Sequence, residues 1–196
     1  MRKHLLSPPV AVCVMGLLVV SVAASGCRPA DLPVAPRSEL SHLDRLLRLM
    51  EQRLALMHDV ARLKWKVGKP IEDPKRESEL LQVVVERSRG KGIHPDLVRS
   101  FFAAQMAAAR LVQQADFDRW KAKEQEPLAD TASLEVLRQR IDQLNGELID
   151  ALAEICPSLS AVTVQQALPQ RAEEILSGNG LAGVRDTTIA PLLRGL

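Results

Sequence analysis

Apolar side chains recur every three or four residues along two long stretches of the chain, which is the spacing of an amphipathic helix. The first stretch extends from about Ser38 to Val67, and its apolar seam is Leu40, Leu43, Leu47, Met50, Leu54, Met57 and Ala61. The second extends from about Ser133 to Ile155, with Leu134, Leu137, Ile141, Leu144, Leu148, Ala151 and Ile155. A heptad-like seam is typical of helices that pack side by side, so the pattern predicts a bundle.

Helix-breaking and helix-capping residues define the other predicted elements. Gly68 and Pro70 end the first helix, and the pair Asp73-Pro74, an N-cap followed by proline, begins a second helix that reaches about Ser88. Further helices are predicted over about residues 94–121, 161–167, 170–177 and 187–194, with a polar loop around Pro127. We find no convincing strand, so we predict an all-α fold, a helical bundle in which residues 38–196 form one domain.

The composition agrees with a helical, globular protein. Of the 196 residues, 46% are hydrophobic and only 3% are aromatic, and tyrosine is absent. Sparse aromatic residues together with abundant leucine and alanine favour helices over sheets. The apolar content is too high for an intrinsically disordered chain, and the length is sufficient for one domain with its own core.

The first 26 residues have the features of a secretory signal peptide. Arg2 and Lys3 precede a short apolar stretch, residues 10–22, which is followed by the small residues 23–26. The stretch is too short and wrongly flanked for a membrane-spanning helix. We therefore expect an exported, periplasmic protein in which residues 27–37, which contain three prolines, form an extended tether.

Cys27 follows the small residues directly and leaves two interpretations of the cleavage site. The sequence Ala24-Ser25-Gly26-Cys27 is similar to a relaxed bacterial lipobox, in which case Cys27 carries a lipid that anchors the protein to a membrane. Alternatively, the signal peptide is cleaved after a small residue and Cys27 remains a thiol. With Cys13 removed in the leader and Cys27 acylated, Cys156 has no partner, so we expect no intramolecular disulfide and interpret Cys156 as a buried apolar side chain.

Charge and motifs exclude several classes of function. Loss of Arg2 and Lys3 with the leader leaves 24 basic residues, which match the 24 acidic residues. A neutral chain that is poor in aromatic residues is not expected to bind nucleic acid. Residues 178–183 match the pattern GxGxxG but follow a predicted helix rather than a strand, so no dinucleotide site is predicted. His42 and His58 are far apart on one helix, and we predict no metal site.

Two basic residues of the first predicted helix are candidates for anion binding. Arg53 and Lys64 are eleven residues apart, which returns them to nearly the same helix face about 16 Å apart along the axis. Met57 and Val60 lie between them on that face, so the two cations could clamp a small dianion over an apolar floor. The alternative is that both side chains extend to solvent from the edge of the bundle, as lysines and arginines commonly do.

A wider set of spaced residues resembles the helical chorismate mutases. It comprises Arg53, Lys64-Trp65, Pro70-Ile71-Glu72-Asp73, Arg76-Glu77, Ile93-His94-Pro95-Asp96, Phe101-Phe102, Gln113, Phe117-Asp118 and Trp120-Lys121. A later set is similar to the additional helical region of the exported, or gamma, subclass, namely Arg138, Ile141-Asp142 and Leu144-Asn145. The resemblance covers about residues 45–150 and implies an isomerase that converts chorismate to prephenate without metal or cofactor.

The resemblance also implies roles for individual residues. Arg53, Arg76 and Arg138 would hold the two carboxylates of chorismate, and Arg138 would come from the same chain. Lys64 would contact a carboxylate and the ether oxygen, to which Gln113 would donate from the other side. Each protomer would then contain a complete site, and we expect a homodimer.

Two acidic residues have an implied role that also has a structural alternative, and three other positions differ from the family pattern. Glu77, with Asp73, would receive the ring hydroxyl group. Asp73 is equally well explained as a helix cap. For Glu77 the alternative is a favourable charge in the first turn of a helix, and we favour the substrate contact. Leu80 and Ala109 stand where the exported subclass often has glutamine and a small hydroxyl residue, and Gln113 replaces the glutamate of several relatives.

A second hypothesis needs no catalysis. A non-enzymatic helical lipoprotein could act as a periplasmic interaction module through the seam of its first helix, because heptad seams form the core of any bundle. That hypothesis predicts nothing about Arg53, Lys64, Arg76 and Gln113 as a group.

Overall fold

The computed structural model describes residues 36–123, 132–178 and 180–194. The helices are α1 (Arg37–Lys66), α2 (Pro74–Arg87), α3 (Pro95–Lys123), α4 (Leu134–Ile155), η1 (Cys156–Ser158), α5 (Val162–Ile175), η2 (Leu181–Val184) and α6 (Arg185–Leu193). The described ranges contain helices and no strand, so the predicted all-α class is confirmed. The predicted signal peptide, Cys27, most of the tether and the loop around Pro127 lie outside these ranges. None of the described helices is long and apolar enough to cross a membrane.

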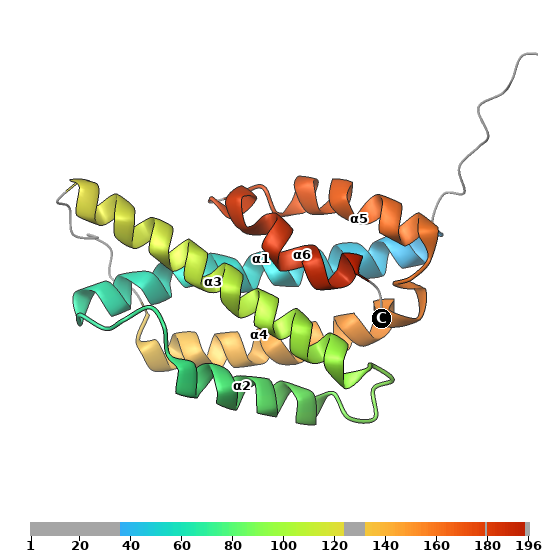
Figure 1. Ribbon diagram of the computed structural model, residues 1–196, viewed down its shortest axis with the longest axis horizontal. Coiled ribbons are helices and arrows are strands. Elements are labelled where there is room, and N and C mark those ends of the chain that lie inside the picture. Colours follow the sequence, from blue (N-terminus) through green and yellow to red (C-terminus); the bar gives the residue numbers. More distant parts are fainter. Residues whose placement is uncertain (1–35, 124–131, 179, 195–196) are drawn as a thin grey trace, which may run out of the picture. The chain divides into compact units, whose positions relative to one another are not determined.

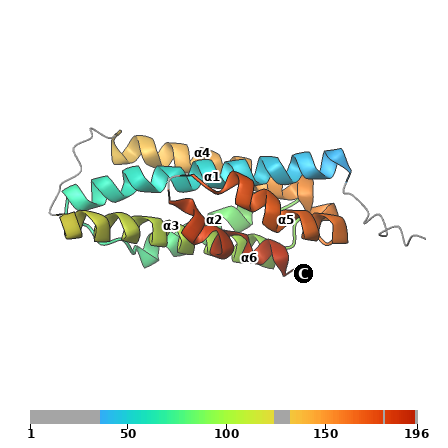
Figure 2. The same ribbon diagram turned by 90° about the horizontal axis from the view of Figure 1, so that it is seen from above.

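The other helices are arranged around α1. It packs against α3, α4 and α5, while α2 contacts α3 and α4, and α6 packs on α3. Figure 1 shows α2 at one edge of this arrangement and α5 with α6 at the other. In the view from above, α4 and α3 lie on either side of α1 (Figure 2). The central position of α1 brings its two ends into contact with different sets of neighbours.

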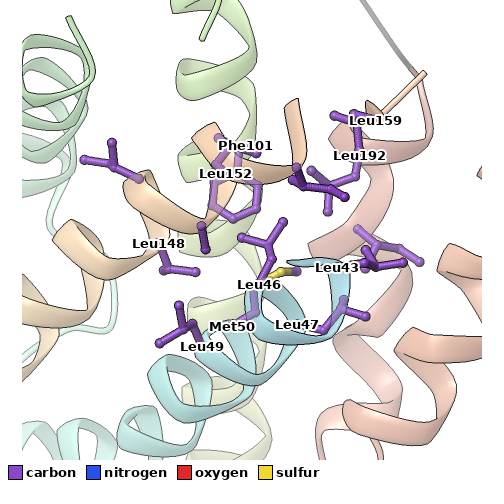
Figure 3. Close-up of a cluster of buried hydrophobic side chains, with 14 of the residues drawn as sticks. Leu43, Leu46, Leu47, Leu49, Met50, Phe101, Leu148, Leu152, Leu159 and Leu192 are labelled. Atoms are coloured by element: carbon purple, nitrogen blue, oxygen red, sulfur yellow. The ribbon is translucent and has the colours of Figure 1, made fainter. Parts of the chain in front are cut away.

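The N-terminal half of α1 lies in a close-packed apolar core. The side chains of Leu43, Leu47 and Met50 are fully buried there. Figure 3 shows them clustered with Phe101 of α3 and Leu152 of α4, which are also fully buried. Burial of these large side chains is the main stabilising contribution at this end of the bundle.

The first four helices begin and end within two residues of the predicted boundaries, and local capping explains where α2 and α4 begin. Pro74 is the first residue of α2, preceded by Asp73 as N-cap. At the start of α4, the Ser133 hydroxyl accepts a hydrogen bond from the backbone N–H of Val136 at 3.3 Å. These caps satisfy N–H groups that have no partner within the helix, so they fix where each helix starts.

The predicted break between residues 167 and 170 is wrong. Residues 162–175 form the single helix α5, with Pro169 inside it. An interior proline removes one backbone hydrogen bond and costs about 3 kcal/mol. Val164, Leu168 and Ala172 form one buried face that continues across the proline, and their burial offsets that cost.

The interpretation of Cys156 as a buried side chain is also wrong. Cys156 is only partly buried because it lies where α4 ends and η1 begins. Its Sγ atom is 4.0 Å from the carbonyl oxygen of Gly92. Partial burial raises the pKa of the Cys156 thiol above its usual value, which disfavours the reactive thiolate.

Candidate active site

A cavity of about 350 Å³ lies among the C-terminal half of α1, the start of α2, the middle of α3 and the start of α4. Seven of its lining residues are the predicted site residues, namely Arg53, Lys64, Asp73, Arg76, Glu77, Gln113 and Arg138. Apolar side chains complete the walls, among them Met57 and Val60 of α1. The structure therefore brings together all the predicted site residues in one cavity, while their individual roles stay predictions.

Arg53 is a buried cation held by two neighbouring helices. Its side chain is only 3% exposed, so the alternative that it extends to solvent is wrong. Its Nε atom donates to Oδ1 of Asn145 at 3.0 Å, and Nη1 donates to the carbonyl oxygen of Gln105 at 3.3 Å. Burial lowers the pKa of Arg53 to about 10, which still leaves the guanidinium group charged at neutral pH.

Lys64 lies near the C-terminal end of α1, where the chain turns toward α2. Its Nζ atom donates a hydrogen bond to the carbonyl oxygen of Ile71, which fixes the ammonium group against the connecting segment. Desolvation lowers the pKa of Lys64, while the carboxylates of Asp73 and Glu77 act in the opposite direction. The ammonium group thus lies in a partly dry environment, where its interaction with an anion is strengthened.

The segment between α1 and α2 forms one wall of the cavity. Gly68 has φ of +63°, a left-handed conformation that lets the chain turn sharply after α1. The Asp73 side chain accepts a hydrogen bond from the backbone N–H of Arg76 at 3.2 Å, so its capping role is present in the structure. Because Asp73 also lines the cavity, the cap and a contact with a ligand are compatible.

Gln113 presents a buried amide group to the cavity from α3. Its Nε2 atom donates to the carbonyl oxygen of Ala109 at 3.0 Å and lies 3.9 Å from Sδ of Met57. Its Oε1 atom is buried without a hydrogen-bond partner in the described structure. Thioether sulfur is a weak acceptor, so the N–H directed at Met57 can be given to a better acceptor at little cost.

Arg110 is a basic residue of the cavity that was not predicted from the sequence. It lines the cavity, and its Nη1 atom is 2.5 Å from Oε2 of Glu77 across the interface between α3 and α2. Arg110 precedes Gln113 by three residues, which puts both on neighbouring positions of one helix face. That spacing could have identified it, whereas its pairing with Glu77 depends on tertiary structure.

The charges that line the cavity favour an anionic ligand. The described lining carries six basic residues against three acidic ones, and Lys69 and Glu72 belong to it although neither was predicted as a site residue. The excess of positive charge lies beside the apolar side chains of Met57, Val60 and Ile141. Such a cavity can bind a small dianion with an apolar body, hold its charged ends and stabilise negative charge that develops between them.

Comparison with known proteins connects this chain to one enzyme family. The family model described as chorismate mutase type II matches residues 37–114. The secreted chorismate mutase of Mycolicibacterium smegmatis is 27% identical over 163 residues, which cover 83% of this chain and 90% of that protein. The secreted chorismate mutase of Mycobacterium tuberculosis is 26% identical over 162 residues, which cover 83% of this chain and 81% of that protein.

A solved structure agrees with these sequence similarities. The chorismate mutase of Burkholderia thailandensis has 32% sequence identity to this chain and superposes with a TM-score of 0.72. The match covers 78% of this chain and 99% of that structure.

Proposed function

Because this chain belongs to the chorismate mutase type II family, we propose that its cavity binds chorismate and rearranges it to prephenate. The protein is thus an isomerase. The observation that carries the assignment of the site is the convergence of seven predicted residues on one cationic cavity. A non-enzymatic interaction module gives no reason for that convergence.

The reaction needs electrostatics and positioning rather than acid–base chemistry. One carbon–oxygen ether bond breaks while a carbon–carbon bond forms within the same molecule, so no nucleophile and no net proton transfer are involved. The protein has to select the compact conformer of the substrate and to stabilise negative charge that grows on the ether oxygen. Fixed donors in a partly dry cavity do both, since they are oriented before the substrate arrives.

Three arginines bind the two carboxylates in this proposal. Arg53, Arg76 and Arg138 belong to α1, α2 and α4, so they approach one cavity from three helices. Guanidinium groups pair with carboxylates through two parallel hydrogen bonds, which fix direction as well as charge. Carboxylates held from different helices bring the two ends of chorismate together in the compact conformer.

Lys64 and Gln113 act on the ether oxygen. Lys64 belongs to α1 and Gln113 to α3, and both line the cavity. The Nζ group of Lys64 has three N–H donors, of which the Ile71 carbonyl takes one, so others remain for the ether oxygen and a carboxylate. Gln113 gives the N–H that is directed at Met57 in the free enzyme.

Glu77 binds the ring hydroxyl group, with Asp73 as a second acceptor. Glu77 lies in the first turn of α2 and Asp73 is the N-cap of that helix, and both line the cavity. Arg110 pairs with Glu77 at 2.5 Å and holds its carboxylate in place. A carboxylate held in this way accepts the hydroxyl proton in a hydrogen bond without taking part in the chemistry.

Turnover of chorismate by the purified protein tests this proposal. Chorismate absorbance should fall, and prephenate should accumulate in equal amount, at the same rate with and without a metal chelator. Absence of turnover at millimolar chorismate would refute the enzymatic function. Activity that the chelator abolishes would refute the metal-free mechanism.

The secreted relatives and the predicted signal peptide support export of this chain. We assign it to the exported, gamma subclass, with a lipid anchor on Cys27 in the periplasm. The protomer is expected to form a homodimer in which each copy has a complete site, since all seven site residues line one cavity of a single chain.

Fatty-acid labelling in cells tests the anchor. The wild-type protein should take up label and fractionate with membranes, whereas Cys27→Ser should do neither. Cys156→Ser is the matched control, because it removes a partly buried thiol of the folded domain and should keep the label. A wild-type protein that is unlabelled and soluble would favour simple signal cleavage.

A further inference from the structure

We propose that Asn145 is a positioning residue for the reaction, which fixes the Arg53 guanidinium group through a neutral acceptor and leaves its charge for a substrate carboxylate. This inference rests on the proposed chorismate mutase function. Asn145 belongs to α4 and is 92 residues away from Arg53 in sequence. It does not line the cavity, so it acts through Arg53 rather than on the substrate.

The geometry around Arg53 defines the orientation of its guanidinium group. The Asn145 side chain is 1% exposed, and its Oδ1 atom accepts the Nε–H of Arg53 at 3.0 Å. The carbonyl oxygen of Gln105 on α3 accepts from Nη1 at 3.3 Å. Two acceptors on different atoms of a planar group fix both its position and its plane. Among the described contacts they use two of five N–H donors, so enough remain for a bidentate carboxylate.

The neutral character of the acceptor matters as much as its position. A carboxylate at position 145 would also accept the Nε–H, but it would neutralise the charge that attracts the substrate. An amide oxygen gives the hydrogen bond without a counter-charge. Arg53 is the buried cation among the described residues, and no acidic side chain is among its hydrogen-bond partners there. Its charge is therefore available to an incoming anion.

The position of Asn145 on α4 connects it to a second site residue. Arg138 lies seven residues before Asn145, which is about two helical turns, so both are on the same face of α4. One face of α4 thus contributes Arg138 directly and orients Arg53 through Asn145. A rotation or shift of α4 would change both carboxylate contacts together.

A double-mutant cycle tests whether Asn145 acts through Arg53. Asn145→Leu has a similar size and no acceptor, and we expect it to lower kcat/KM by about tenfold or more. In the Arg53→Met background the same substitution should change kcat/KM by less than about twofold, because the group that it orients is absent. Thr188→Val, which removes another fully buried polar group, is the control for a general effect of lost burial and should leave kcat/KM unchanged.

Asn145→Asp provides a test that does not depend on the folding of the leucine variant. It should fold at least as stably as the wild type, because aspartate pairs with Arg53. It should nevertheless raise KM for chorismate by about tenfold, because the guanidinium charge is neutralised. A purely structural role of Asn145 predicts an unchanged KM for this stable variant.

The outcomes separate this inference from the proposed function. An active wild type with an unchanged kcat/KM in Asn145→Leu, an equal loss in both backgrounds, or an unchanged KM in Asn145→Asp would overturn the role of Asn145 alone. A wild type without chorismate turnover would overturn the function itself.

Discussion

The two halves of α1 share one apolar spacing but serve different purposes. In the N-terminal half, Leu43 and Met50 are fully buried in an apolar cluster with Phe101 of α3. In the C-terminal half, Arg53 and Lys64 line a cavity of about 350 Å³. Spacing alone sets which face of a helix is covered, and the comparison shows that it does not determine whether that face meets side chains or a cavity.

The facing residues of α3 account for the difference. Phe101 and Phe102, both fully buried, fill the space beside the N-terminal half of α1. Seven residues further along the helix, the corresponding buried positions are Ala108 and Ala109, and Ala109 lines the cavity. These short side chains leave a volume that is bordered by long basic side chains, so a cavity replaces the packed core within one pair of helices.

Substitutions in the N-terminal half of α1 should mainly lower the stability of the protein. Leu46 is fully buried in the apolar cluster, and Leu46→Ala should lower the free energy of unfolding by about 2–5 kcal/mol. Turnover per folded molecule should stay near the wild-type value, because the cavity is formed by other residues. Urea unfolding and a chorismate assay on the same preparation measure both quantities. A large loss of turnover with normal stability would contradict a purely structural role for the N-terminal half of α1.

Substitutions of cavity residues in the C-terminal half of α1 should mainly lower the catalytic rate. Lys64→Ala removes the proposed donor to the ether oxygen and should lower kcat by about 10²-fold or more. Its stability should change little, since Lys64 is only partly buried. Lys66→Ala, which changes a nearby lysine of α1 that does not line the cavity, is the matched control and should keep full activity. A folded, fully active Lys64→Ala enzyme would show that Lys64 does not contact the substrate.

Alkaline pH should reduce activity. Only the protonated forms of Lys64 and Arg53 bind an anion, and burial lowers the pKa of both groups, that of Arg53 to about 10. The cations are therefore present at low pH and are lost as the pH rises through these lowered values. We expect kcat/KM to fall by about tenfold per pH unit beyond the lower of the two. A profile that stays flat to pH 11 would contradict the involvement of both groups.

Gln113→Glu should convert a pH-independent donor into a pH-dependent one. A glutamine amide donates at any ordinary pH, whereas a carboxyl group donates only when it is protonated. The variant should be about tenfold slower at neutral pH and should recover part of its rate in acid, while the wild-type rate stays level from about pH 5 to 8. Gln114→Glu, at an exposed position of α3, is the control. An unchanged, flat profile would mean that Gln113 does not contact the ether oxygen.

Arg110→Met should have the smallest effect. Arg110 and Glu77 are both partly exposed, so loss of their ion pair should raise KM for chorismate by about two- to fivefold with little change in stability. Arg99→Met removes an exposed arginine from the same helix and should leave KM unchanged. A KM equal to that of the wild type would show that Glu77 needs no partner.

Residues that act locally could be predicted from the sequence. Asp73 and Pro74 fix the start of α2 through one turn of backbone, and the eleven-residue spacing of Arg53 and Lys64 puts them on one face of α1. The resemblance to a known family added Gln113 and Arg138, which are far from the others in sequence. The structure places both in the same cavity.

Features that depend on tertiary packing could not be predicted in this way. The continuity of α5 through Pro169 depends on a face that is buried only when the helices assemble. The Arg110–Glu77 pair and the Arg53–Asn145 hydrogen bond join residues 33 and 92 positions apart, and neither pattern is visible along one helix. Partners of this kind follow from the arrangement of helices rather than from the periodicity of any one of them.

A crystal structure of the protein with a stable cyclic dicarboxylate ether, shaped like the compact conformer of chorismate, tests the central claim most directly. The ligand should occupy the cavity at the C-terminal half of α1. Its carboxylates should lie within hydrogen-bond distance of Arg53 and of Arg76 or Arg138, and its ether oxygen should face Lys64 and Gln113. A ligand bound elsewhere, or in the cavity with its ether oxygen directed away from both Lys64 and Gln113, would contradict the account.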